Sequence, residues 1–108
     1  VRYAQEALEW IRGEKETDWV ALVTARSDSG AGKSYCFNSS PIFGWPASAG
    51  DCGSNYSLDS YYKRDVTITR LDNSCTVSCQ IKVSITVQWK DLGVGYTVPV
   101  QSVMSIWE

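Results

Sequence analysis

Residues 80–89 read QIKVSITVQW, and this stretch decides the fold. Apolar side chains occupy every second position from Ile81 to Trp89, and polar side chains occupy the positions between them. Successive side chains of a β-strand point to opposite faces of a sheet, so a strict period of two is typical of a strand with one buried face. The sequence therefore predicts a half-buried strand at these residues.

The segments on either side of this strand repeat the alternation. Residues 66–69 read VTIT and residues 96–101 read YTVPVQ, and the turn-forming stretches at 71–74 and 90–95 separate them from the central strand. We therefore expect an antiparallel meander. Pro99 has no N–H for a ladder hydrogen bond, so its strand should lie at an edge of the sheet or should turn that nitrogen outward.

The N-terminal residues 1–19, VRYAQEALEWIRGEKETDW, have the periodicity of an amphipathic helix. We expect this helix to end between Gly13 and Asp18, and Thr17 or Asp18 to cap a short second helix. The apolar face of the first helix consists of Tyr3, Ala4, Ala7, Leu8 and Ile11. The buried side of the second is expected to hold Trp19, Val20, Leu22 and Val23. A short apolar run of this kind could also be an extended segment, and we favour the helix.

The start of the helix lacks a cap. No Ser, Thr, Asp or Asn precedes its apolar stripe, although such residues usually satisfy the first N–H groups of a helix. We therefore expect the helix to continue upstream of Val1.

Together these elements predict an α+β fold, in which the N-terminal helix packs on an antiparallel sheet. A sheet with one apolar face needs a cover, and this helix is the only long apolar stripe in the sequence. We predict a single domain of residues 1–108, with a helical segment at 1–26, a variable loop region at 27–60 and the sheet at 61–108. The loop region is rich in Ser, Gly, Asn, Pro and Asp, and a loop of this length is usually functional or stapled.

The four cysteines favour disulfides over a metal site. The chain has no His, and its Cys spacings do not match the paired knuckles of zinc ribbons. Proximity in sequence suggests that Cys36 pairs with Cys52 and that Cys75 pairs with Cys79, which is one of three possible connectivities. The second pair can form only if residues 76–78 turn, as they would at the tip of a hairpin. An oxidising compartment is indicated.

The aromatic side chains of the loop region allow two interpretations. They could form a recognition surface for sugar rings or a partner protein, with Tyr35, Phe43, Trp45 and Tyr56 as candidates. Alternatively, they anchor the loop to the sheet, and we favour this interpretation because the loop has few aliphatic residues for that purpose.

Composition argues against several classes of function. Without His there is no Ser-His or Cys-His pair, and the carboxylates show no recognisable pairing, so we predict no enzyme, no catalytic residue, no metal and no cofactor. Ten basic and twelve acidic residues are scattered along the chain, which gives no signal for nucleic acid. No run of about 18 apolar residues is present, so a membrane contact would need the upstream segment.

Motifs at both ends resemble one known family. Within AQEALEWIRGEKETDW the spacing of Ala4, Gln5, Glu6, Glu9, Arg12 and Trp19, followed by KRDVTIT, IKVSITVQW and a Trp near the C-terminus, resembles the soluble part of type IV pilins, and of minor pilins and type II secretion pseudopilins in particular. Major pilins of that family often close a C-terminal loop with a disulfide. Here every Cys precedes the central strand and none follows it, so the resemblance implies a minor or atypical subunit.

The resemblance implies a structural role at the cell surface. The chain would be a subunit of an extracellular filament used for adhesion, motility, DNA uptake or secretion, and it would be anchored in the membrane before assembly. Its partners would be other pilin subunits, contacted through the N-terminal helix and its residues Tyr3, Ala4, Ala7, Leu8 and Ile11. The alternative is a secreted, disulfide-stabilised binding module, such as a lectin-like or receptor domain, whose aromatic loop binds the ligand.

Overall fold

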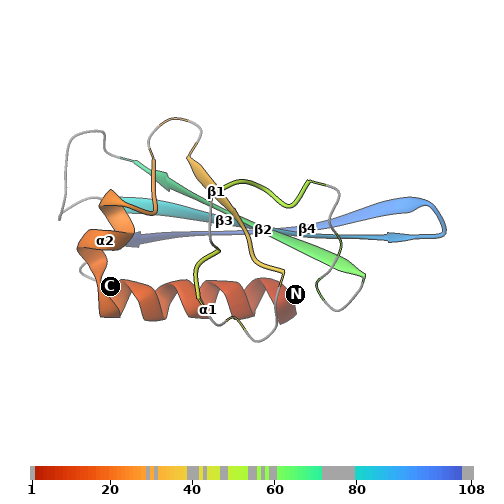
Figure 1. Ribbon diagram of the computed structural model, residues 1–108, viewed down its shortest axis with the longest axis horizontal. Coiled ribbons are helices and arrows are strands. Elements are labelled where there is room, and N and C mark those ends of the chain that lie inside the picture. Colours follow the sequence, from red (N-terminus) through yellow and green to blue (C-terminus); the bar gives the residue numbers. More distant parts are fainter. Residues whose placement is uncertain are drawn as a thin grey trace.

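The computed structural model describes residues 2–28, 30, 32–38, 42, 44–46, 49–53, 56, 58, 61–71 and 80–105. In this part of the chain two helices are followed by four strands (Figure 1). Their bounds are α1 Arg2–Thr17, α2 Trp19–Thr24, β1 Lys33–Cys36, β2 Tyr62–Arg70, β3 Gln80–Asp91 and β4 Val94–Ser105. The α+β class expected from the sequence is confirmed.

The four strands form one antiparallel sheet in the order β1-β2-β3-β4. The β2–β3 pairing runs without a break from Tyr62 opposite Trp89 to Arg70 opposite Ile81. The β3–β4 pairing is longer and also unbroken. The predicted meander is therefore confirmed, with longer outer strands than the sequence indicated and with β1, which the sequence did not locate, added at one edge.

Strand β4 forms the other edge of the sheet, and Pro99 lies near its middle. The Leu71 N–H donates to the Gln80 carbonyl, 2.9 Å away. The backbone N–H and C=O groups of successive residues in an antiparallel strand point to opposite neighbouring strands. Since Gln80 bonds to β2, the even-numbered residues of β3 hydrogen-bond to β2 and the odd-numbered residues hydrogen-bond to β4. Pro99 lies opposite Thr86, so its nitrogen points away from β3, as predicted, and interrupts the outer edge of the sheet.

The turn between β3 and β4 consists of two residues, Leu92 and Gly93. Both have positive φ angles, 51° and 79°, which is the pattern of a type I′ turn. The sequence predicted a turn here. It did not predict that Leu92, rather than a Gly or Asn, would adopt the left-handed conformation, or that its side chain would be 97% exposed.

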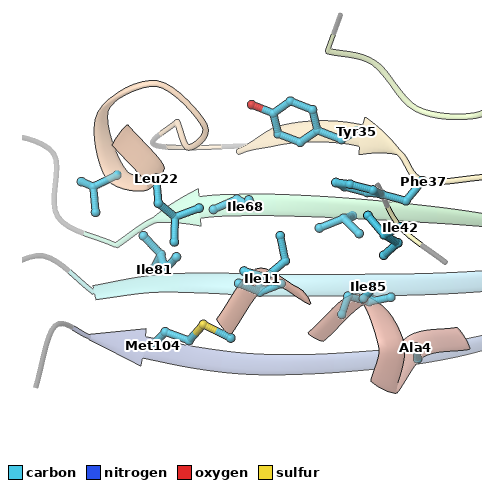
Figure 2. Packing of buried hydrophobic residues seen from close by; sticks show 14 of the residues in the cluster. Ala4, Ile11, Leu22, Tyr35, Phe37, Ile42, Ile68, Ile81, Ile85 and Met104 are labelled. Carbon is cyan, nitrogen blue, oxygen red and sulfur yellow. The ribbon is translucent and has the colours of Figure 1, made fainter. Parts of the chain in front are cut away.

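Helix α1 lies lengthwise across one face of the sheet and contacts β2, β3 and β4 (Figure 1). Ala4, Ala7 and Ile11 are buried against Ile81 and Ile85 and their neighbours in the core (Figure 2). Tyr3 and Leu8 are partly buried against the same core. Burial of such apolar side chains contributes about 1.5–3 kcal/mol for each large one, so this interface is a main source of stability.

Helix α2 begins at the cap that the sequence proposed. The Asp18 carboxylate accepts a hydrogen bond from the Ala21 N–H at 3.1 Å, while the Thr17 hydroxyl donates back to the Gly13 carbonyl. Trp19, Leu22 and Val23 are buried as predicted. The prediction for Val20 is wrong, because this side chain points away from the core and is 48% exposed.

Candidate functional site

A cluster of four aromatic rings joins the helices to the loop that follows β1. Trp10 of α1 packs on Phe37 and Trp45, with ring centroids 5.5 and 5.1 Å apart. Tyr35 of β1 packs on the same two rings. Tyr35 and Phe37 are almost completely buried (Figure 2). These rings hold the described part of the loop on the core, as the interpretation that we favoured expects. The prediction of Tyr35 as a surface recognition residue is wrong, because its ring is in the core.

The Tyr35 hydroxyl has a structural partner. It donates a hydrogen bond to the Arg26 carbonyl, 3.1 Å away. Burial raises the pKa of Tyr35, and the neighbouring Arg26 charge only partly opposes this effect. The phenol is therefore a protonated donor and offers no base for catalysis.

Trp45, like Trp10, is only partly buried in the cluster. Its indole N–H donates to the Glu14 carboxylate at 2.7 Å, and the Arg26 guanidinium lies 4.6 Å from the ring centroid. The Trp45 ring thus has three kinds of contact: with the aromatic cluster, with Glu14 of α1 and with Arg26, which lies just beyond α2. Such fixation gives the ring one defined orientation at the surface.

A groove opens beside Trp45, and we call it the Trp45 groove. It has a volume of about 260 Å³ and is lined by Glu14, Thr17, Asp18, Ala21, Leu22, Arg26 and Trp45. Small-molecule sites usually enclose about 300–1,000 Å³, so the groove fits one sugar ring or one amino-acid side chain. The Glu14 and Asp18 carboxylates and the Arg26 guanidinium line the groove, and such groups can hydrogen-bond hydroxyl or amide groups.

The disulfide predicted between Cys36 and Cys52 is confirmed. It joins the end of β1 to the loop before β2, and the Asp65 carboxylate of β2 accepts a hydrogen bond from the Cys52 N–H at 2.6 Å. Burial raises the pKa of Asp65, and the Cys52 N–H and Lys63 only partly offset it. Cys75 and Cys79 lie outside the described residues.

The same three residues are the candidate metal ligands in the described part of the chain. The ligand atoms of Cys36, Cys52 and Asp65 lie within 4.8 Å of one another. Both sulfurs are bonded to each other, so neither is a thiolate that could bind a metal. In the oxidised protein these three residues therefore form a structural cross-link, and they do not provide a set of metal ligands.

Tyr56 and Phe43 were the other predicted recognition residues. The ring of Tyr56 lies beneath two ammonium groups, Lys63 at 5.2 Å and Lys90 at 5.6 Å from its centroid. This is a cation–π arrangement in which cations already occupy the ring. Phe43 lies outside the described residues. Among the candidates that the structure describes, Trp45 lines the groove described above.

Sequence reasoning missed the most buried charged side chain among the residues that the structure describes. Arg64 of β2 is completely buried, and it forms an ion pair with Glu6 of α1 at 2.8 Å. One signal was available, because Arg64 has the same strand parity as Val66 and Ile68 and so belongs to the inner face. The partner on the helix could not be deduced from that parity.

The apolar stripe that the resemblance assigns to filament contacts packs inside this chain. Ala4, Ala7 and Ile11 are covered by the sheet, and Tyr3 and Leu8 are partly covered. Their contribution to contacts with other subunits stays a prediction.

Comparisons with models of known protein families, with curated proteins and with solved structures found no match to this chain. None of the helices in the described residues is long and apolar enough to cross a membrane. The case for a function therefore rests on the motifs and the geometry above.

Proposed function

We propose that the chain is the globular part of a minor or atypical pilin, a structural subunit of an extracellular type IV pilus-like filament. One observation carries the proposal: α1 lies lengthwise on one face of an antiparallel meander, with a stapled loop region between helix and sheet (Figure 1). This is the arrangement that the resemblance in residues 4–19 and 63–89 implies.

Two further features support a structural role outside the cell. The Cys36–Cys52 disulfide is compatible with an oxidising compartment. The Arg64–Glu6 pair fixes the helix relative to the sheet, as a subunit needs if its helix is to carry the globular part at a constant orientation along a filament. Adhesion, motility, DNA uptake and secretion are the uses that such filaments would have.

The first test examines the coding sequence upstream of Val1 and the surface filaments of the source cells. About 20 apolar residues continuous with α1 are expected upstream. Antibodies raised against residues 1–108 should label sheared filaments in immunogold electron microscopy, and deletion of the gene should abolish the labelling. A cleaved signal peptide followed by a helix cap, with the protein free in the medium, would rule the filament out.

A second candidate is a secreted binding module, and the Trp45 groove favours it. The fixed indole beside Glu14 and Arg26 resembles a platform for a sugar ring or a polar side chain. Oligosaccharides titrated into the 108-residue chain should shift NMR signals of the groove residues, and Glu14→Gln should weaken this binding. Trp89→Phe, at a ring remote from the groove, is the matched control. Shifts that spread over the whole sheet, or that survive Trp45→Ala, would contradict this candidate.

A further inference from the structure

Three side chains with metal-binding atoms converge where β1 meets β2. Cys36 ends β1, Cys52 belongs to the loop before β2, and Asp65 lies in β2 directly opposite Cys36. The two sulfurs and a carboxylate oxygen of Asp65 lie within 4.8 Å of one another. Two ligand atoms on one tetrahedral zinc ion lie about 3.5–3.8 Å apart, given bonds of about 2.3 Å to sulfur and about 2.0–2.2 Å to oxygen. The three side chains are therefore close to the spacing of one set of zinc ligands.

The disulfide is what keeps these residues from binding a metal. Metals are bound by thiolates, and each sulfur of the oxidised chain is bonded to the other. Cys36 is partly exposed, whereas Cys52 is 8% exposed. Cys36 is thus the more accessible of the two to a thiol reductant, and attack on its sulfur releases Cys52 as the leaving thiolate.

Hydrogen bonds hold the loop in place independently of the disulfide. The Gly50 N–H donates to the Ser34 carbonyl of β1 at 2.8 Å, and the Cys52 N–H donates to the Asp65 carboxylate of β2 at 2.6 Å. These bonds attach residues 50–52 to both strands. When the S–S bond is broken, the two thiols remain neighbours, and they need to separate only from bonding distance to about 3.8 Å in order to share a zinc ion.

The donor atoms select the kind of ion. Two thiolates and one carboxylate suit zinc, whereas Mg²⁺ and Ca²⁺ prefer sets made of oxygen alone. The Cys52 N–H occupies one acceptor position of Asp65, and a carboxylate has about four, so others remain for the ion. Such a hydrogen bond orients a ligating carboxylate, as outer-shell partners do at metal sites. Because Cys36 is partly exposed, water can reach the fourth position.

We propose that reduction of the Cys36–Cys52 disulfide turns these three residues into a zinc site, in which both Cys sulfurs and the Asp65 carboxylate hold the ion and water completes the tetrahedron. Two molecules of a thiol reductant join in one disulfide and pass two electrons and two protons to the Cys36–Cys52 bond. The zinc ion then displaces the two thiol protons. The metal replaces the covalent cross-link, so β1 stays joined to the loop in either state. The site does not rest on the proposed filament.

The test measures metal binding by the 108-residue chain with Cys75→Ser and Cys79→Ser, in which Cys36 and Cys52 are the only cysteines. The chain is reduced with dithiothreitol, freed of it without air, and titrated with Co²⁺. The visible absorption of tetrahedral, thiolate-bound Co²⁺ should saturate at one ion per chain, and Zn²⁺ should displace the Co²⁺.

Urea unfolding gives a second measurement. Zn²⁺ should raise the urea midpoint of the reduced chain, because it binds the folded state, and should leave the midpoint of the oxidised chain unchanged. Where reduction alone unfolds the chain, Zn²⁺ should restore its circular dichroism, since binding then drives folding.

Two carboxylate variants test the third ligand. Asp65→Asn should weaken Zn²⁺ binding at least about tenfold, the smallest effect expected even for an outer-shell partner. Asp51→Asn is the matched control, because it removes the same charge from a carboxylate that acts on Asp65 through space but lies outside the cluster. It should leave the affinity nearly unchanged.

Four results would overturn the proposal. They are a reduced chain that neither binds the two ions nor is stabilised by Zn²⁺, binding that survives Cys36→Ser/Cys52→Ser in the same background, equal affinities of Asp65→Asn and Asp51→Asn, and equal binding by the oxidised chain. An octahedral Co²⁺ spectrum would equally contradict the site, because it would place the ion on surface oxygens. None of these outcomes depends on whether cells display the protein in filaments.

Discussion

Arg64 of β2 and Glu6 of α1 form an ion pair with Nη1 2.8 Å from Oε1, across 58 residues of sequence. The same Nη1 donates to the Tyr3 carbonyl, and Nε donates to the Phe37 carbonyl, each at 2.9 Å. The Arg64 side chain is completely buried, whereas that of Glu6 is 26% exposed. One guanidinium therefore connects the helix, the inner face of the sheet and the chain that leaves β1.

Loss of this guanidinium should strongly destabilise the domain. Arg64→Ala removes the charge that Glu6 faces and the N–H groups that donate to the Tyr3 and Phe37 carbonyls, so we expect a loss of about 3–5 kcal/mol in the free energy of unfolding. Urea unfolding followed by circular dichroism measures it. Glu6→Gln keeps an acceptor at the partly exposed end of the pair and should cost less, about 1–2 kcal/mol. Equal losses for the two variants would contradict the geometry.

Removal of the disulfide should cost about 3 kcal/mol, because it closes a loop with a sequence separation of 16. The variant Cys36→Ser/Cys52→Ser tests this in urea unfolding and leaves the other two cysteines in place. Peptide mapping of the oxidised wild-type chain should give a fragment that links Cys36 to Cys52. A fragment that links Cys36 to Cys75 would show that the connectivity is different.

Acid should stabilise the protein through Asp65. Burial raises the pKa of this carboxyl in the folded state above its ordinary value of 3.8. The folded state therefore binds the proton more readily than the unfolded state, and this contribution is present at low pH and is lost as pH rises through the folded-state pKa.

Asp65→Asn isolates the effect, because the amide oxygen can still accept from the Cys52 N–H. The free energy of unfolding of wild type minus that of the variant should rise when pH is lowered from 7 towards 4. Denaturant unfolding at a series of pH values measures this difference. A difference that falls on acidification would mean that the ionised carboxylate is the stabilising form.

Two glycines should respond to Ala in opposite directions. A Cβ on Gly32, which has φ +83°, would meet Thr69 Oγ1 and would lie 2.9 Å from Thr67 Cγ2, so Gly32→Ala should destabilise by about 1–3 kcal/mol. Gly13 lies inside α1 with no heavy atom within 4 Å of a Cβ, so Gly13→Ala should stabilise by about 0.5–1 kcal/mol. Thermal unfolding of both variants checks the signs, and a stabilising Gly32→Ala would contradict the close approach of this loop to β2.

The parts of the fold that could be predicted from the sequence are those that depend on local sequence patterns. The alternation at 80–89, the helical stripe of α1 and the Asp18 cap each depend on residues within a few positions of one another. Strand β1 has only four residues inside a polar loop, and its place at the sheet edge depends on pairing with β2, which no local pattern encodes. The ion pair of Arg64 with Glu6 and the hydrogen bond of Trp45 to Glu14 are likewise contacts between distant residues.

The candidate site was predictable only in part. Trp45 was named as a surface aromatic, but its neighbours Glu14 and Arg26 were not, because Glu14 lies in α1 and Arg26 lies beyond the end of α2, far from Trp45 in sequence. Tyr35 was misplaced since its strand was not located, and an aromatic residue in a loop can face either way. Leu92 was treated as an ordinary turn residue, because its positive φ becomes visible only when the two-residue turn is known.

The position of the disulfide has a mechanical consequence. Cys36 and Cys52 join β1 to the loop behind it, and neither belongs to α1. Tension applied along α1 would therefore act in shear on the helix–sheet interface, where Ala4, Ala7, Ile11 and the Arg64 contacts share the load in parallel. The disulfide would bear no load until the helix had separated from the sheet. The force needed to unfold the domain is therefore set by non-covalent packing.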